Sequence, residues 1–533
     1  MFPHRSNGAL MSGKPAQRLL VVAFLIHVAA VMGYLLREGR LAVVPIYDDV
    51  AYLIDALRRL PALEEHGVLG LLVSFVREPP HGPLTVLAAI SGLLVSSGEP
   101  WGAYLLNAVL WGGVFLAMAW LSLRKAAPIA RVGILVAIIA SPVMGFLVAE
   151  LRPDPVWGLL IGGAVALLAS VNPLVMWKWH LVGLGALFGL AALAKPSALP
   201  ATIVVLGGSF VVQIASASFV ARSTAGVGRT ISWTLLGALT VLVPYLIFNG
   251  QHVVAYILMV FGSENEIWRT EGSLLVHLTY YLNPITGRLA LGWVWYGAPI
   301  LLVCAFVALA WRGDKRSLIG GIGVLVALAL AYVITAASGV KSLMIGSILY
   351  GTIIGATIWS AGRIVEAMRV HPLTWFAGGV ALALVAWTPM AGMFRSHDPA
   401  MVATNAATDV TAPLVLEAMA RFEGTPVVLV TAPGPIYAGT LNFFAIQAGY
   451  RGATFRSGYT WGDRAVFDAA ISSADIIVVS EPGMVGQGLG FNFPSIELQS
   501  GILNDLRNDG RFVGRRVYVD PDGLGIWLFE RRV

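Results

Sequence analysis

The sequence predicts a polytopic α-helical membrane protein that ends in a small α/β domain on the outer side of the membrane. Of its 533 residues, 57% are hydrophobic and only 12% are charged, whereas soluble proteins carry about 25% charged residues. Apolar runs long enough to cross a bilayer recur as far as residue 394, and short β-branched runs alternate with amphipathic stretches after residue 415. These patterns exclude a soluble enzyme.

The net charge and the cysteine content exclude further classes of protein. The net charge of +6 is attributed to basic cytoplasmic loops, so no nucleic-acid partner is expected. The single cysteine, Cys304, lies in an apolar run and excludes a disulfide framework or a thiolate metal cluster.

The first apolar run, residues 19–36, predicts an uncleaved first membrane helix. It follows Arg5, Lys14 and Arg18, which place the N-terminus in the cytoplasm by the positive-inside rule. The run is long and has no clear small-residue cleavage site, unlike a signal peptide.

Later apolar runs predict the remaining membrane helices. They lie near residues 101–121, 132–149, 155–171, 180–194, 199–218, 231–249, 291–311, 318–336, 342–360 and 374–394. A further run, residues 83–95, is short and bounded by Pro and Gly, and if it crossed, Arg124, Lys125 and Arg131 would lie outside. We therefore predict that it is an interfacial or re-entrant helix on the outer side. This gives about eleven crossings, with the N-terminus inside and the C-terminus outside.

The composition changes after the last apolar run. We predict a membrane domain over residues 1–394, a linker over 395–414 and an outer α/β domain over 415–533. The α/β domain is expected to contain strands at 426–431 and 475–480, helices at 464–473 and 495–508, and a hairpin of 516–520 with 525–530 around Asp522-Gly523. The Gly-rich stretch 483–490 is not followed by a clear helix start, which favours a surface loop over a nucleotide site.

The first outer loop, residues 37–100, carries Tyr47-Asp48-Asp49 and then Arg77-Glu78-Pro79-Pro80-His81. Two adjacent carboxylates at the mouth of a membrane helix are destabilising unless a cation lies nearby. The alternative is a helix cap, but capping alone requires only one Asp.

A second charged cluster, Glu150-Leu151-Arg152-Pro153-Asp154, is predicted on the same outer face. Lys195 and Lys341 also fall outside, against the positive-inside bias. An ammonium at this boundary is a suitable partner for a lipid phosphate, and snorkelling to ordinary head groups is the alternative. Acids and cations from separate segments on one face favour a functional site.

The order of these motifs resembles the GT-C integral-membrane glycosyltransferases, and most closely the family 39-like branch of protein O-mannosyltransferases and lipid A aminoarabinose transferases. The resemblance covers residues 19–220. It depends on Asp48-Asp49 after the first helix, the segment from Glu78-Pro79-Pro80 to Leu84, the Arg152-Pro153-Asp154 turn and Ala194-Lys195-Pro196. In that branch, Glu usually takes the position of Asp49, and a cation usually takes that of Glu78.

The resemblance implies transfer of a sugar from a polyprenyl-phosphate donor to a glycolipid, polysaccharide or protein acceptor. The expected location is the outer face of a bacterial inner membrane, with the C-terminal domain in the periplasm. Our hypothesis is an inverting displacement with Asp49 or Asp48 as general base. Replacement of Asp49 by Asn is expected to abolish transfer while folding and donor binding persist.

The remaining candidate residues have supporting roles in this hypothesis. Those expected to bind the donor phosphate are Arg152, Lys195, Lys341 and Arg77. Those expected to contact substrate are Tyr47, Glu78, His81 and Glu150. Asp154 would orient Arg152, or would join Asp48 and Asp49 around a divalent cation such as Mg or Mn. Metal-free catalysis is equally open.

Two other classes of protein stay open at this point. A lipid-linked sugar flippase or another transporter would carry charges near the middle of the membrane and an internal inverted repeat. A non-catalytic envelope scaffold would use the outer domain to bind glycan. The charges instead gather on one face and no repeat is visible, which favours the transferase.

Overall fold

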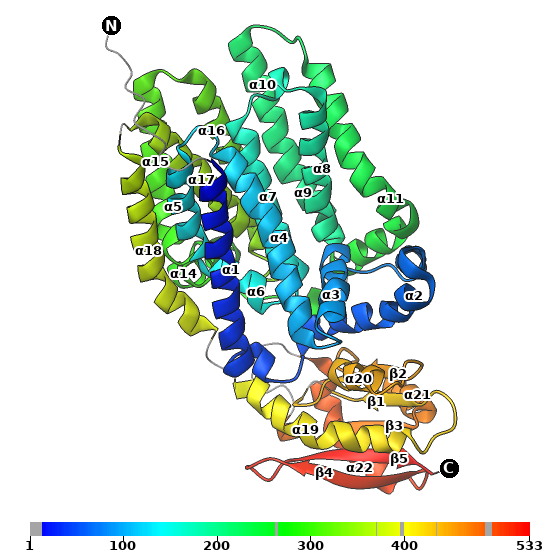
Figure 1. Ribbon diagram of the computed structural model, residues 1–533. Coiled ribbons are helices and arrows are strands. Elements are labelled where there is room, and N and C mark those ends of the chain that lie inside the picture. The colour runs from blue at the N-terminus through cyan, green and yellow to red at the C-terminus, as the bar shows by residue number, and fades with distance from the viewer. Residues whose placement is uncertain are drawn as a thin grey trace, which may run out of the picture.

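The computed structural model describes residues 13–261, 265–368, 370–394, 399–432, 434–484 and 493–532. A large bundle of helices carries a small domain at one end, and α1 begins at the opposite end of the bundle (Figure 1). The helices of the bundle and its loops are α1 (Gly13–Arg37), α2 (Tyr47–Arg77), α3 (Pro83–Val95), α4 (Pro100–Ser122), α5 (Pro128–Ile139), α6 (Pro142–Ala149), α7 (Pro153–Ser170), α8 (Lys178–Ala194), α9 (Leu199–Thr202), α10 (Gly208–Ala221), α11 (Val227–Phe261), α12 (Asn265–Trp268), α13 (Leu274–Thr279), α14 (Pro284–Leu291), α15 (Trp293–Arg312), α16 (Lys315–Ala337), α17 (Ser347–Ala367) and α18 (Pro372–Met393).

The membrane spans agree with the sequence prediction. Within the described ranges, nine helices are long and apolar enough to cross a bilayer, and the pair α5 and α6, bent by 64°, adds a tenth if it is counted as one broken span. Helix α8 is apolar and has 17 residues, so counting it gives the predicted eleven. Helix α3 has 13 residues, or roughly 20 Å of helix at 1.5 Å per residue, too short for the hydrocarbon core.

Glycine allows the central helices to approach closely. A Cβ on Gly351 of α17 would lie 1.8 Å from the carbonyl oxygen of Gly158 in α7, and a Cβ on Gly162 would lie 1.9 Å from that of Gly351. A Cβ on Gly185 of α8 would likewise lie 1.8 Å from the carbonyl oxygen of Thr234 in α11. Small residues at helix contacts are typical of membrane bundles, and these contacts make α7 and α17 the buried centre.

Helix α2 lies across the end of the bundle, between it and the small domain (Figure 1). It is kinked at Gly67, where φ is 63°, a conformation that glycine adopts without strain. Beyond the kink, Val68, Leu69 and Leu72 are exposed. Exposed apolar side chains of this kind are typical of a helix that lies along a membrane surface.

The C-terminal domain is a five-stranded sheet with helices on both faces. The strand order is β2-β1-β3-β5-β4, with β1 parallel to β2 and β3, and β5 antiparallel to β3 and β4. Residues of β1 and β3 alternate between a core shared with α19 and α20 and a core shared with α21 and α22. The elements are α19 (Pro399–Met419), β1 (Val427–Val430), α20 (Ala438–Gln447), β2 (Thr454–Ser457), α21 (Arg464–Ser473), β3 (Ile476–Ser480), α22 (Gln499–Asn508), β4 (Phe512–Val519) and β5 (Gly525–Arg531).

The predicted linker is largely part of this domain. Residues 399–414 form the first three quarters of α19, and Ala407 and Ala412 are buried in the core beside β1. The boundary at residue 415 is therefore corrected towards the N-terminus, because an apolar helix face covers the sheet. The predicted stretch 483–490 lies outside the described residues from 485 onwards.

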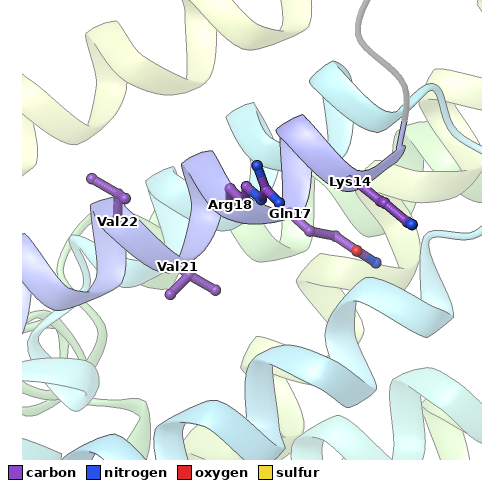
Figure 2. Close-up of a pocket in the computed structure, with 5 residues that line it drawn as sticks. All are labelled: Lys14, Gln17, Arg18, Val21 and Val22. Carbon is purple, nitrogen blue, oxygen red and sulfur yellow. The ribbon is translucent and has the colours of Figure 1, made fainter.

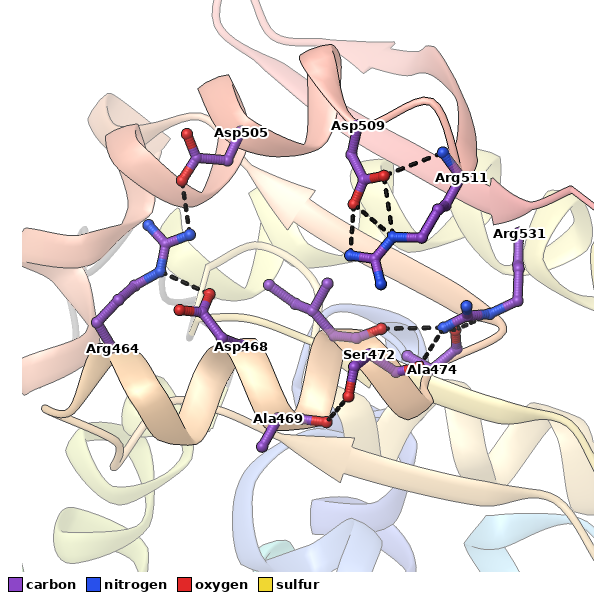
Figure 3. Close-up of polar contacts among 10 residues, drawn as sticks. Arg464, Asp468, Ala469, Ser472, Ala474, Asp505, Asp509, Arg511 and Arg531 are labelled. Carbon is purple, nitrogen blue, oxygen red and sulfur yellow. Dashed lines mark hydrogen bonds and ion pairs between the residues drawn. The ribbon is translucent and has the colours of Figure 1, made fainter.

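Ion pairs and hydrogen bonds connect the helices of this domain to each other and to the sheet (Figure 3). Arg464 of α21 pairs with Asp468 (2.8 Å) and reaches Asp505 of α22 (2.6 Å). The guanidinium of Arg531 donates to the carbonyl oxygen of Ala474 (2.7 Å) just after α21. These contacts hold α21, α22 and β5 together.

Candidate active site

The two adjacent carboxylates at the start of α2 point in different directions. The side chain of Asp48 is 67% exposed, whereas that of Asp49 is 0% exposed. Successive residues of an α-helix project about 100° apart. The first turn of α2 therefore presents one carboxylate to solvent and directs the other into the protein.

Asp49 is bound by donors from three other segments. Its carboxylate accepts hydrogen bonds from the Tyr104 hydroxyl (2.6 Å) and from the backbone N–H of Leu151 (3.1 Å). It also pairs with the guanidinium groups of Arg40 (2.9 Å) and Arg152 (3.4 Å). A buried carboxylate is tolerated when its charge and its acceptor sites are satisfied in this way. The Asp49 carboxylate therefore contacts the segment before α2, helix α4 and the α6–α7 connection at once.

Arg152 links this buried group to the exposed carboxylate. Besides Asp49, it pairs with Asp48 (3.1 Å) and Glu150 (3.1 Å), and Glu150 in turn pairs with Arg40 (2.9 Å). Burial opposes the charge of Arg152, but Glu150, Asp48 and Asp49 outweigh it and raise its pKa. Burial raises the pKa of Glu150, although Arg40 and Arg152 act against the rise. Arg152 is thus a permanent cation whose solvent-facing partner is Asp48.

Asp154 and Lys195 form a second ion pair at the same end of the bundle. The Nζ of Lys195 lies 2.5 Å from Asp154 Oδ1 and 5.5 Å from the centre of the Trp157 ring. Pro153 begins α7, which leaves Asp154 in its first turn, where the helix dipole favours a carboxylate. Pro196 cannot continue α8, so Lys195 is left at its C-terminal end.

His81 lies close to both ion pairs. Its ring is 4.3 Å from that of Tyr256 and 6.4 Å from that of Tyr52, measured between centres. Desolvation and the nearby Lys195 lower the pKa of His81, against the opposing effect of the carboxylates of Asp154 and Asp48. The imidazole is therefore neutral near pH 7, and it can donate or accept a hydrogen bond but does not supply a cation.

Four predicted site residues are placed differently from this cluster. Arg77 and Glu78 are exposed at the end of α2 and form no ion pair among the residues that the structure describes.

Lys341 is buried, and its Nζ donates to the carbonyl oxygens of Thr335 (2.7 Å) and Ala336 (2.8 Å) at the end of α16. Burial lowers the pKa of Lys341. Tyr47 packs edge to face against Tyr437 of the C-terminal domain, at 5.5 Å. Their predicted roles with donor or substrate stay predictions.

Arg40 and Tyr104 belong to the cluster, and sequence reasoning did not identify them. Arg40 was one of many arginines in a loop, and Tyr104 one of several aromatic residues at the start of an apolar run. A single buried hydroxyl or guanidinium leaves no periodic pattern. The available signal was the need of two adjacent carboxylates for nearby cations, and Arg40 is the nearest preceding cation in the chain.

The three predicted metal-binding carboxylates are each paired with a cation. Asp48 pairs with Arg152, Asp49 with Arg40 and Arg152, and Asp154 with Lys195. In the part of the chain that the structure describes, no group of three His, Cys, Asp or Glu side chains is placed to hold a metal ion. Because a cation already occupies each carboxylate, this donor set does not fit a metal ion.

Two surface hollows lie on the bundle away from this cluster. One follows a face of α1 near its start and is lined by Lys14, Gln17, Arg18, Val21 and Val22 (Figure 2). The other lies between α10 and α16, with Lys315 at its edge. Both have the mixture of cationic and apolar side chains expected where a membrane helix meets lipid head groups.

The arrangement of the helical bundle and the C-terminal domain is shared with solved membrane proteins of the GT-C fold. No family model matches the chain, and no curated protein matches it in sequence. Among solved structures, ArnT from Cupriavidus metallidurans in the apo state has a TM-score of 0.61 at 12% identity, over 97% of this chain and 98% of that chain. ArnT bound to undecaprenyl phosphate has a TM-score of 0.58 at 12% identity, over 95% and 97%. This similarity confirms the fold implied by the sequence resemblance.

Proposed function

We propose that the protein is a GT-C-type glycosyltransferase that moves a sugar from a polyprenyl-phosphate donor to an acceptor hydroxyl. The reaction would take place at the end of the bundle that carries the C-terminal domain, on the periplasmic face of a bacterial inner membrane. The observation that carries the proposal is the exposed Asp48 carboxylate, 3.1 Å from Arg152. Asp48 and the Asp154–Lys195 pair both lie close enough to His81 to influence its pKa. The fold of ArnT, which binds undecaprenyl phosphate in one structure, supports the choice of donor.

Asp48 is the carboxylate suited to act as general base. It is open to solvent, and the buried Asp49 cannot reach an acceptor without displacing Tyr104, Arg40 and Arg152. In the proposed step, Asp48 takes the proton of the acceptor hydroxyl as that oxygen bonds to the anomeric carbon. The bond from this carbon to the phosphate oxygen breaks, and polyprenyl phosphate leaves. The configuration at the anomeric carbon is thereby inverted.

Arg152 and Lys195 are proposed to bind the donor phosphate. The leaving phosphate gains negative charge as the bond to the sugar breaks, and fixed cations stabilise that charge more in the transition state than in the ground state. Asp154 orients Lys195, and Asp49 and Glu150 orient Arg152, through the ion pairs described above. His81 would contact the sugar or the acceptor as a neutral group.

The test compares envelope lipids and glycans by mass spectrometry in cells that carry the wild-type protein or Asp48→Asn at matched expression. Loss of one sugar from one acceptor, with accumulation of one polyprenyl-phosphate sugar, would support the transferase and identify both substrates. Asp522→Asn, in the exposed hairpin turn of the C-terminal domain, is the control and should leave the profile unchanged. An unchanged profile with Asp48→Asn would contradict the proposal.

A further inference from the structure

The C-terminal domain contacts the short segment that leads into α2 and Asp48. The Thr440 hydroxyl of α20 donates to the carbonyl oxygen of Pro45 (2.7 Å), and Asn405 Oδ1 of α19 accepts from the backbone N–H of Val44 (3.0 Å). Thr440 is 0% exposed. Two polar side chains of the outer domain thus bind the backbone of the loop just before the catalytic carboxylate.

Packing surrounds these two hydrogen bonds. A Cβ on Gly439 would lie 2.9 Å from Val50 Cγ1, one turn into α2, so α20 and α2 touch closely. Phe443 and Ile446 of α20 are buried in the main core of the helical bundle. Helix α20 is therefore shared by the two domains, and the outer domain is part of the structure around the site.

The segment that these contacts hold has a strained backbone. Tyr47, directly before Asp48, has a φ of 58°, which is uncommon for a residue other than glycine. Such a conformation persists only where the surroundings impose it. Here the surrounding contacts are the hydrogen bonds of Thr440 and Asn405 to the backbone of Pro45 and Val44. The rings of Tyr47 and Tyr437 are also in contact. The φ of Tyr47 sets the direction in which α2 starts, and so sets which of the two carboxylates faces outwards.

We propose that Thr440 and Asn405 of the C-terminal domain are positioning residues for the reaction. They hold residues 44–47 in the strained conformation that directs Asp48 towards solvent and Arg152 while Asp49 stays inside. This inference rests on the proposed function, because Asp48 is the base there. It gives the outer domain a catalytic purpose that does not depend on its touching either substrate.

The experiment measures steady-state sugar transfer by purified full-length protein, using the donor and acceptor that the mass-spectrometric comparison identifies. Thr440→Val, which keeps the shape and removes the hydroxyl, is expected to lower kcat about tenfold, because a small misplacement of a catalytic group is costly. The KM for the donor should stay within about twofold, since Arg152 and Lys195 are untouched. Thr440→Ser and Asn405→Asp keep the donor and the acceptor respectively and should retain kcat, whereas Asn405→Leu should behave as Thr440→Val.

Thr431→Val is the matched structural control. Thr431 is also buried in the C-terminal domain, but its hydroxyl donates to Gln499 (2.6 Å), away from residues 44–47. The Thr431→Val variant should have a lower melting temperature and an unchanged kcat. The inference is overturned if Thr440→Val leaves kcat unchanged, or if Thr440→Val and Thr431→Val lower kcat and melting temperature alike. If Asp48→Asn retains transfer while Thr440→Val loses it, the proposed base is wrong and the coupling between the domains stands.

Discussion

Asp48 and Asp49 are neighbours in the chain, yet the structure places one at the surface and buries the other. Asp49 lies between two guanidinium groups, a tyrosine hydroxyl and a backbone N–H, all within 3.4 Å. Removing one partner of a buried ion pair leaves the other charge uncompensated, at a cost of about 3–5 kcal/mol. Asp48 remains largely solvated, and its pair with Arg152 contributes little to stability. Asp49 supports the fold, and Asp48 has the exposure that the proposed general base requires.

This division predicts different effects of the two Asn variants on stability. Asp49→Asn should lower the melting temperature of the detergent-purified protein by several degrees or more, because Arg40 and Arg152 lose a buried partner. Asp48→Asn should melt within about one degree of the wild-type protein, since exposed pairs are worth about 0–1 kcal/mol. Thermal unfolding followed by intrinsic tryptophan fluorescence measures both, and equal melting temperatures would show that burial does not separate the two roles.

Among the helices, the contact between α7 and α17 depends on glycine at four positions. Gly158 and Gly162 of α7 face Gly351 and Gly355 of α17, with backbone against backbone. Helix α7 supplies Asp154 in its first turn, so this contact positions one end of the site. Close packing is the main attraction between helices in lipid, where the hydrophobic effect does not draw them together.

A single methyl group should separate these two helices. Gly351→Ala places a Cβ 1.8 Å from the Gly158 carbonyl oxygen, and the helices cannot move apart without losing their packing. We expect a large loss of monodisperse protein in size-exclusion chromatography after detergent extraction. Gly378→Ala in α18, where a Cβ meets nothing within 4 Å, is the control and should be tolerated. Equal yields of the two variants would contradict the role assigned to this contact.

The elements that the sequence predicted are those with a local pattern. Helix α21 has the predicted bounds of residues 464–473, because its Asp463 cap and amphipathic spacing are local signals. Strand β2 was missed because its four residues lie at the sheet edge and are half exposed. Helix α20 was missed because its ten residues face two cores at once, which hides any amphipathic period.

The same limit applies to the site. The positions of Asp48, Arg152, Asp154 and Lys195 at one end of the bundle followed from charge and span counting, both local in the sequence. The choice between Asp48 and Asp49 did not, because it depends on the phase of α2, which the strained Tyr47 and the C-terminal domain determine. Long-range contacts of this kind leave no periodic signature in one sequence.

At the scale of the whole molecule, several lysines gather at the end of the bundle opposite to Asp48 and the C-terminal domain. Lys14, Lys178 and Lys315 lie in the first turns of α1, α8 and α16, respectively. All three helices run from that end towards the end that carries Asp48 and the C-terminal domain (Figure 1). At the far end, Lys125 and Arg363 approach Glu366. The positive-inside rule predicts that the end rich in lysine is cytoplasmic, and the proposed site would then face the periplasm.

This orientation can be tested with single cysteines, because Cys304 is the only native cysteine. In a Cys304→Ser background, Asp522→Cys in the exposed hairpin turn should react with a membrane-impermeant maleimide once the outer membrane is permeabilised. Lys315→Cys, exposed at the start of α16 at the opposite end, should react only after the inner membrane is broken. The reverse pattern would place the C-terminal domain and Asp48 in the cytoplasm. The proposed donor would then have to be presented on the inner leaflet, so the labelling decides on which side of the membrane the acceptor must be sought.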